Sequence, residues 1–448
     1  MKPKLFNIKM LAILAIAATV SFTSCKDEDD DEIKGEKIVV TGNITTNTTW
    51  QATDTVYMDG YVYVKSGAIL TIEPGTLIKG ITDSKAALIV ERGAKVIAEG
   101  TTQKPIVFTS EKPAGQRQPG DWAGIIICGA APINQTGGTA EMEGGTGAQY
   151  GGNNATDNSG ILKYVRIEFA GYEVSSGNEI NGLSMGGVGS GTTIEYVQVS
   201  YGRDDSFEWW GGTVNAKHIV SYCGGDDDFD TDNGFSGKIQ YGLILRHPDY
   251  ADKSDASNGF ESDNDANGSG NLPFTQATFS NITILGPYKT KDQAGVNPNH
   301  GNGLRLRRNT RINLHNSVIA GFKVGVLLEG TSASLYNNGG GVIKNTALVG
   351  CLTNFKPGNT DPLTPEQFDA MWTAGTNTIH SENSDVNLTN AWNYTNVNPM
   401  PLTGSPLLSG ANFTGMNVWF ETVTYRGAFG TTNWTQGWCN WDPQNTVY

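Results

Sequence analysis

Charge is scarce in this chain. Asp, Glu, Lys and Arg make up 17% of its 448 residues, against roughly 25% in ordinary soluble domains. Bases are scarcer than acids, because 31 Lys and Arg face 45 Asp and Glu, which leaves a formal net charge of -14. With no basic stripe to offset the acids, nucleic acid is excluded as the main partner.

Long apolar runs are also nearly absent, and this excludes a protein with several membrane spans. The single run, residues 10–20, is shorter than the ~20 residues of a membrane-spanning helix. Three lysines precede it, as in a secretory signal peptide. Small residues then lead directly to Cys25, which resembles the lipobox of bacterial lipoproteins. The resemblance implies that residues 1–24 are removed and that Cys25 carries lipid; ordinary cleavage with a spare thiol is the alternative.

An acidic segment follows the cysteine. Residues 27–32 are all Asp or Glu, and because like charges repel, residues 25–38 are predicted to form a solvated tether. The run resembles the acidic export signal of Bacteroidota lipoproteins. That resemblance implies a lipid-anchored protein of the outer membrane that faces the cell exterior, with a periplasm-facing anchor as the alternative.

Cysteine and histidine are few and scattered. The four later cysteines have no CxxC spacing, and the five histidines form no HExxH motif. A zinc ribbon, a CxxC redox site and a zinc-protease helix are therefore not indicated. Buried thiols are expected at Cys128, Cys223, Cys351 and Cys439.

Glycine and short repeated segments, by contrast, are abundant. The chain has 57 glycines, and the apolar centre of one recurring segment advances in steps of 24, 22, 31, 44 and 22 residues. These centres are Leu183, Phe207, Phe229, Phe260, Leu304 and Val326. A unit of about 22 residues predicts an all-β fold, a right-handed parallel β-helix whose coils bury one another. A β-propeller is the alternative, but its blades need about 40 residues each.

The repeat also suggests where the β-helix ends. We expect it to span 39–350, followed by an aperiodic C-terminal region and cap at 351–448. Within that region Thr364 and Pro365 predict the start of a short helix. Four late tryptophans are expected to cover the open end of the solenoid, or alternatively to stack on sugars. They are Trp419, Trp434, Trp438 and Trp441.

A second column of the repeat contains amides. Asn281, Asn316 and Asn345 fall at equivalent positions, where stacked amides could satisfy one another's hydrogen bonds. Residues 71–76, 105–110 and 425–430 resemble stretches of β-helical surface lipoproteins from Bacteroidota. This resemblance implies the fold and the location, and it supplies no catalytic residue.

Alternation along each strand predicts an acidic patch. If the aromatic centres point inward, their immediate successors point outward, and neighbouring coils lie about 4.8 Å apart. The resulting patch holds Glu208, Asp230, Asp232, Glu261 and Asp263, edged by Trp210, Arg305 and Arg307. We expect ligand contacts from Glu208, Trp210, Glu261, Arg305 and Arg307.

Carboxylates stacked so closely need compensation, because each pair repels by on the order of 1 kcal/mol even in water. The face could be solvated or neutralised by arginine, it could bind Ca²⁺, or some acids could stay protonated for catalysis. The expected calcium ligands are Asp228, Asp230, Asp232, Asp263, Asp265 and Asn267. Residues 263–268 match the start of a D-x-D-x-[DN]-G calcium loop, although Phe274 replaces its final Glu.

Two other motifs carry little weight. Ser184 lies in a G-x-S-x-G match, but a nucleophile elbow needs a strand that enters a helix. Residues 299–303 and 311–313, with Asp204 and Asp205 upstream, faintly resemble polygalacturonase-type β-helix hydrolases. Both motif elements are altered here, so the resemblance does not support that activity.

The sequence therefore supports three functions from different classes. The first is a surface lipoprotein that binds an extended ligand, a glycan, for nutrient capture beside a TonB-dependent importer. The second is a polysaccharide lyase or hydrolase on the same scaffold, for which Arg305, Arg307 or His300 beside Ca²⁺ would be the base. The third is a structural or adhesive surface protein. No catalytic residue is identified.

Overall fold

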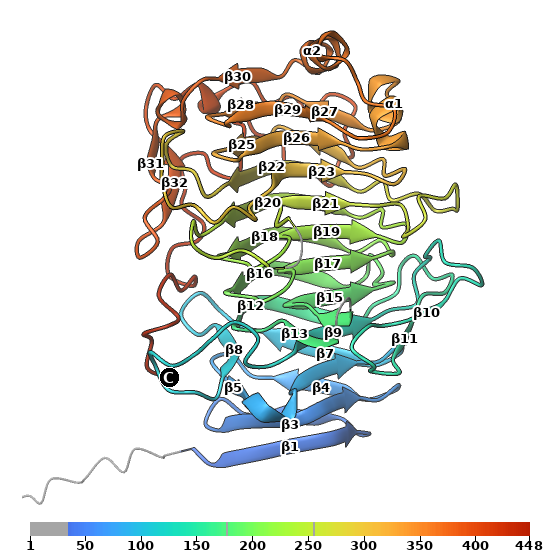
Figure 1. Ribbon diagram of the computed structural model, residues 1–448. Helices are drawn as coiled ribbons and strands as arrows, with labels where there is room; N and C mark the ends of the chain where they lie inside the picture. Colours follow the sequence, from blue (N-terminus) through green and yellow to red (C-terminus); the bar gives the residue numbers. More distant parts are fainter. Residues whose placement is uncertain (1–34, 176–177, 254–255) are drawn as a thin grey trace, which may run out of the picture. The chain divides into compact units, whose positions relative to one another are not determined.

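The computed structural model describes residues 35–448 except 176–177 and 254–255 (Figure 1). Cys25 and the acidic run lie outside the described residues. Within these limits, 26 strands form one sheet in which each strand pairs in parallel with strands of the adjacent coils. The expected right-handed parallel β-helix is confirmed. None of the described helices is both long and apolar enough to cross a bilayer.

Each coil has three flat sides, which we call faces A, B and C. Face A follows the recurring aromatic segment, and its strands pair one coil after another. They are β6 (Ala87–Val90), β9 (Gly124–Cys128), β15 (Leu183–Gly186), β17 (Phe207–Trp210), β19 (Phe229–Asp232), β21 (Phe260–Ser262), β23 (Asn302–Leu306), β26 (Val324–Leu328) and β29 (Thr353–Pro357).

Faces B and C share long strands that bend between them. The shared strands are β12 (Gly160–Glu168), β16 (Thr193–Ser200), β18 (Asn215–Tyr222), β20 (Lys238–Leu245) and β22 (Thr278–Leu285). Later coils split them into β24 (Asn313–His315) and β27 (Val342–Lys344) on face B, and β25 (Val318–Ala320), β28 (Ala347–Val349) and β30 (Thr378–His380) on face C.

The first coils follow the same plan. Their strands are β1 (Lys37–Ile44), β2 (Thr48–Trp50), β3 (Thr55–Val64), β4 (Ile69–Ile72), β5 (Leu77–Gly80), β7 (Lys95–Glu99) and β8 (Ile106–Ser110). Two antiparallel hairpins extend from the coils, β10 (Ala140–Glu141) with β11 (Gln149–Tyr150) and β13 (Tyr172–Ser175) with β14 (Asn178–Ile180). A 3₁₀ turn, η1, covers Thr82–Ser84.

The predicted inward column is confirmed. Phe207, Phe229 and Phe260 pair in consecutive coils and are fully buried. The Phe229 ring centroid lies 5.6 Å from that of Phe207 and 5.2 Å from that of Phe260, both edge to face. Leu304 and Val326 continue the column. Apolar packing between coils thus forms the continuous core.

The bend between faces B and C is made by residues in the left-handed conformation. Tyr164, Tyr196, His218, Tyr241, Asn281, Asn316 and Asn345 occupy this column, with φ between 50° and 63°. The predicted asparagine column therefore exists, but the amides find other partners: Asn281 Nδ2 donates to the carbonyl of Tyr425 at 2.9 Å, and Asn316 Nδ2 donates to Ser280 Oγ at 3.1 Å. Asn tolerates this conformation better than most residues.

The last coils are closed by two helices, α1 (Thr331–Asn337) and α2 (Pro365–Ala374). The predicted start of α2 is confirmed, since Thr364 Oγ1 accepts from the Gln367 amide and the Gln367 side chain accepts from the Thr364 amide. Its Phe368 and Trp372 are buried in the core. Parallel pairing continues past residue 350 and ends at β30.

Residues 381–448, which we call the C-terminal strap, return along the outside of face C toward the early coils (Figure 1). The strap contains η2 (Asn383–Val386), β31 (Leu388–Asn390), β32 (Asn398–Pro401) and η3 (Pro406–Leu408). Phe429 and Trp438 join an apolar cluster with Leu243 and Leu285 of face C. The tryptophans expected to cover the open end thus pack on a side, because the outer surface of face C is itself apolar. Figure 1 shows the C-terminus beside β5 and β8.

Candidate functional site

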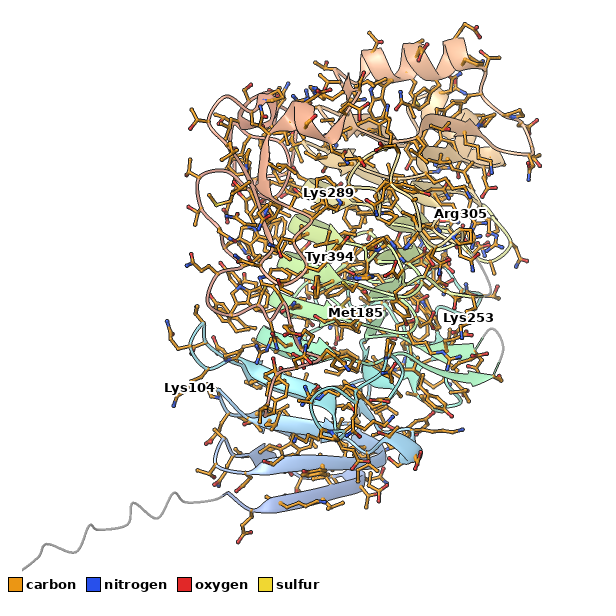
Figure 2. All side chains as sticks on the ribbon, turned by 60° about the vertical axis from the view of Figure 1, so that its left-hand side comes forward. Lys104, Met185, Lys253, Lys289, Arg305 and Tyr394 are labelled. Carbon is orange, nitrogen blue, oxygen red and sulfur yellow. The ribbon has the colours of Figure 1, made fainter. Side chains whose placement is uncertain are left out.

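The acidic column lies in the predicted register on face A. Glu208 pairs with Asp230, Asp230 with Glu261, and Glu261 with Arg305, one coil after another. Figure 2 shows Arg305 at one edge of the molecule, away from Tyr394 of the strap. Glu208 and Glu261 are only 8% and 7% exposed. The carboxylates are therefore stacked, with Glu208 and Glu261 largely withdrawn from water and Asp230 partly exposed.

Turns before the strands of face A add four more acids. The acids form three overlapping groups, and within each group the ligand oxygens lie within 4.8 Å of one another. The groups are Asp204, Asp205 and Asp226; Asp205, Glu208 and Asp230; and Asp227, Asp230 and Glu261. We call these seven residues the carboxylate cluster. The sequence interpretation had placed only its strand members in the patch.

A sequence signal for the added acids did exist. Asp205 and Asp227 each stand two residues before an aromatic centre, and they are 22 residues apart. The structure joins them directly, because the amide of Asp227 donates to Asp205 Oδ1 at 2.9 Å. A column of outward acids therefore continues from the strand into the turn, where the alternation rule no longer applies.

Burial and mutual repulsion raise the pKa values of the cluster. The pKa of Asp230 is raised mainly by the burial of its carboxyl and further by repulsion from Glu208, Glu261 and Asp227. Burial and the same kind of repulsion raise the pKa of Glu261 to about 8, although two nearby arginines oppose the shift. Asp232, beside the cluster, has a pKa raised to about 7 by burial and by Asp263. Part of this face therefore holds protons near neutral pH.

Arginine neutralises only one end of the face. Arg305 Nη1 lies 2.9 Å from Glu261 Oε2, and Arg307 pairs with Glu261 and, at 2.9 Å, with Asp263. In the described part of the chain, no ion pair reaches Glu208 or Asp230. The solvated or Arg-balanced interpretation thus fits the arginine end, and the rest of the face has no counter-charge among the described residues.

The residues expected to bind calcium do not converge. Asp228 is fully buried, and its Oδ2 lies 2.7 Å from Arg246 Nη1. Asp265 accepts from the amide of Asn267 at 2.9 Å and also from Ser269, so its carboxylate closes its own loop. Asp263 forms an ion pair with Arg307, and Asp232 Oδ1 accepts a hydrogen bond of 2.6 Å from the amide of Asn233. Of the six expected ligands only Asp230 lies in the carboxylate cluster.

Trp210 does not present its ring to solvent. It is 7% exposed, and the ring of Tyr150, from the β10–β11 hairpin, lies 6.0 Å away. Both belong to an apolar cluster with Ile133 and Met142. The hairpin covers this part of face A, which the sequence interpretation had left open for ligand stacking.

Of the residues named with the two weak motifs, only Asp204 and Asp205 lie in the carboxylate cluster. Ser184 lies within strand β15 and is nearly fully buried, so it forms no nucleophile elbow. His300 is buried against Arg246 and the carbonyl of His247, and burial lowers its pKa to about 3. Cys128, Cys223 and Cys351 are buried free thiols, as expected, whereas Cys439 is a free thiol that is only partly buried.

The cluster offers two kinds of chemistry. Its closely spaced carboxylates are hard oxygen ligands of the type that Ca²⁺ prefers. One oxygen of Asp226, Oδ1, is buried and has no hydrogen-bond partner within the described residues, so the residues present fit a cation. Carboxyls that keep their protons near neutral pH could instead act as general acids.

Comparison with known proteins gives one match. A family model described as a pectate-lyase-like β-helix domain matches residues 42–438. No curated protein and no solved structure matches the chain. The matched range covers nearly all of the coils and most of the strap.

Proposed function

The chain belongs to the pectate-lyase-like β-helix family, and from that premise we propose that face A binds an extended glycan. One observation carries the proposal: consecutive coils bring seven carboxylates together, in groups whose oxygens lie within 4.8 Å. A row of polar groups repeated at the coil spacing suits a polymer that repeats its own groups along a line. Fold alone does not fix a function, so the argument rests on this cluster.

We further propose that Ca²⁺ is the cation of this face. The cluster supplies Asp205, Glu208, Asp230, Asp227 and Glu261 as oxygen ligands. When bound, the cation would supply the positive charge that lets an acidic face hold a carboxylate-bearing sugar. Arg305 and Arg307 would position the ligand from the neighbouring coil, since both already bind carboxylates.

Binding in the presence and absence of Ca²⁺ tests this proposal. We expect the purified chain to bind polygalacturonate in 1 mM CaCl₂ and to lose most of that affinity in EDTA. Asp230→Asn should reduce the Ca²⁺-dependent affinity at least tenfold, while Asp59→Asn, an exposed control on strand β3, leaves it unchanged. If Ca²⁺ neither changes binding nor raises the melting temperature, the cation assignment is wrong.

Polysaccharide hydrolysis is a second candidate, favoured by the raised pKa values of the buried carboxyls. A protonated carboxyl could donate to the glycosidic oxygen while an ionised neighbour acts as base or nucleophile. Lyase chemistry is less favoured, because Arg305 and Arg307 are held in ion pairs and His300 is buried elsewhere. Reducing-end release from a polysaccharide panel would support hydrolysis, and ultraviolet absorbance of an unsaturated product would support a lyase.

For the cellular setting, we propose a lipid anchor at Cys25 and a place on the outer face of the outer membrane. A glycan-binding β-helix there could hand its ligand to a TonB-dependent importer for nutrient capture. A structural or adhesive role is the alternative, and it predicts attachment to a surface with no saturable binding of soluble glycans.

A further inference from the structure

A second polar site lies on face B, around the corner from the carboxylate cluster. A groove of about 710 Å³ runs between strands β20, β22, β24 and β27 and the part of the strap at residues 412–420. This volume lies within the range of about 300–1,000 Å³ that is typical of small-molecule sites. The groove belongs to neither the carboxylate cluster nor the apolar packing of face C.

The wall of the groove is fixed at both ends. On one side the Asn412 amide donates to Asn316 Oδ1 at 2.8 Å. On the other, Gln240 makes two hydrogen bonds of 2.8 Å with the backbone of Glu421. Between these anchors Asn417 Oδ1 accepts from the Trp419 amide at 3.0 Å. The strap loop is therefore tied to the coils on both sides of the groove.

The charge of the groove is opposite to that of the whole chain. Although the net charge is -14, none of the described residues that line the groove is Asp or Glu. Lys238 and Lys344 both line it, and no ion pair joins either lysine to an acid in the part of the chain that the structure describes. Lys217, at another position on the neighbouring strand β18, does have a partner, since its Nζ lies 2.6 Å from Glu421 Oε1.

The remaining lining is suited to hydroxyl groups. Asn313, Asn412 and Asn417 place amides around the groove, and each amide can donate and accept at once. His315 lies among them, and burial together with Lys344 lowers its pKa to about 4. The neutral imidazole therefore offers one donor and one acceptor at pH 7.

We propose that this groove binds an acidic saccharide, a sugar that carries a carboxylate or a sulfate group. Lys238 and Lys344 lie three coils apart and have no carboxylate partners among the described residues, so each would hold an anionic group of the saccharide. The surrounding amides would hold the hydroxyls. The proposal does not depend on the function assigned to face A, because it needs no cation and uses residues of another face.

The test is calorimetric binding to the full chain in EDTA, which removes any cation from face A. The probes are a trigalacturonate, a sulfated chondroitin hexasaccharide, neutral maltohexaose and inorganic sulfate. We expect one of the two acidic saccharides to bind at least tenfold more tightly than maltohexaose. The acidic probe that binds identifies the anionic group as carboxylate or sulfate.

Variants locate the binding. The pair Lys238→Gln, Lys344→Gln should lower the affinity at least tenfold, since a hydrogen bond to a charged group is worth roughly tenfold or more. The matched pair Lys95→Gln, Lys104→Gln removes the same charge from early coils (Figure 2 labels Lys104) and should have no effect. Asn313→Ala should weaken saccharide binding and leave inorganic sulfate unchanged.

Several outcomes would overturn the proposal. They are the absence of binding by either acidic saccharide, an equal loss of affinity in the two double lysine variants, or the binding of inorganic sulfate alone. Asp230→Asn separates the two sites, because it should abolish Ca²⁺-dependent binding on face A and leave binding in EDTA intact. If Asp230→Asn abolishes both the Ca²⁺-dependent binding and the binding in EDTA, the groove is not a separate site.

Discussion

Two aspartates two residues apart show how differently this chain treats a buried acid. Asp228 is neutralised by Arg246 inside the protein, where both side chains are fully buried. Asp230 has no such partner among the described residues and shares its surroundings with Glu208 and Glu261. In the first arrangement the arginine compensates the buried negative charge, whereas the second leaves repulsion that a bound cation or proton relieves.

The repulsion has a measurable dependence on pH. The folded pKa of Glu261 is raised to about 8, while the unfolded chain has lost that proton well below pH 7. Between pH 7 and 9 the folded state thus binds more protons, and its free energy of unfolding falls as the pH rises, by about 1.4 kcal/mol per pH unit for each proton. His218 and His315, with pKa values lowered to about 4, are neutral when folded and add little slope.

Thermal unfolding in EDTA should therefore show a lower melting temperature at pH 9 than at pH 7. Saturating Ca²⁺ should flatten the difference, because the ion replaces the lost protons. Asp230→Asn should also reduce the slope, and Asp59→Asn should not. A melting temperature that rises between pH 7 and 9 in EDTA would contradict the assignment.

The aromatic column gives a second prediction at this scale. Phe229→Ala should lower the free energy of unfolding by about 3–5 kcal/mol, because it opens a cavity between two packed rings. Val418→Ala, at a position that is 100% exposed, should change it by less than about 0.5 kcal/mol. Urea titration of the two variants makes the comparison, and equal midpoints would mean that the column does not carry the core.

Among the elements, the strap depends most on distant partners. Trp438 is nearly fully buried, and its ring lies edge-on to Tyr164 and Tyr196 at 5.9 Å from each. Those tyrosines stack on one another at 4.4 Å along the corner of the coils. The strap therefore covers a ready-made aromatic ladder, and the apolar outer side of face C is not left in contact with water.

Removing one strap anchor should expose this surface. Trp438→Ala is expected to lower the free energy of unfolding by about 3–5 kcal/mol and to increase the binding of a hydrophobic dye. Trp419→Ala serves as the matched control, because Trp419 is only partly buried, with Lys217 4.8 Å from its ring and Phe420 edge-on at 5.2 Å. This change should cost about 1 kcal/mol or less. Similar losses in both would argue against lateral packing of the strap.

The coils could be predicted from sequence because their evidence is local and repeated. Phe207, Phe229 and Phe260 mark the register, and alternation then places Glu208, Asp230 and Glu261 outward. The strap could not be placed in this way, since Trp438 meets Tyr164 across more than 270 residues and no repeat links them. The cover over Trp210 was missed for the same reason. Asp228 was misplaced because it lies in a turn, where alternation fails.

On the scale of the whole molecule, the two polar sites lie on different faces and differ in charge. The carboxylate cluster lies on face A, and the groove with Lys238 and Lys344 lies on face B. A β-helix can separate such sites because each coil contributes one strand to each face. The chain can thus present two chemically distinct surfaces along one rigid stack.

The proposed cellular location can be tested by changes near the N-terminus. We expect Cys25→Ala to release the protein from the membrane fraction and Cys439→Ala to leave it attached. Replacing the acids of 27–32 with Asn and Gln should protect the protein from protease added to intact cells. Undiminished digestion after that replacement would remove the export-signal interpretation.

The far end of the strap has a consequence for the order in which the protein forms. The Tyr448 hydroxyl donates to Glu168 at 2.6 Å, and Arg117 donates to the carbonyl of Pro443 at 2.6 Å. A stack whose coils contact only their neighbours can grow in the order of synthesis and can open from an end. Here residues 443–448 fasten coils that precede them by more than 270 residues, so face C stays bare until the strap arrives. Nearly the whole chain must therefore be available before the fold is sealed, and a nick in the strap would reopen it from the side.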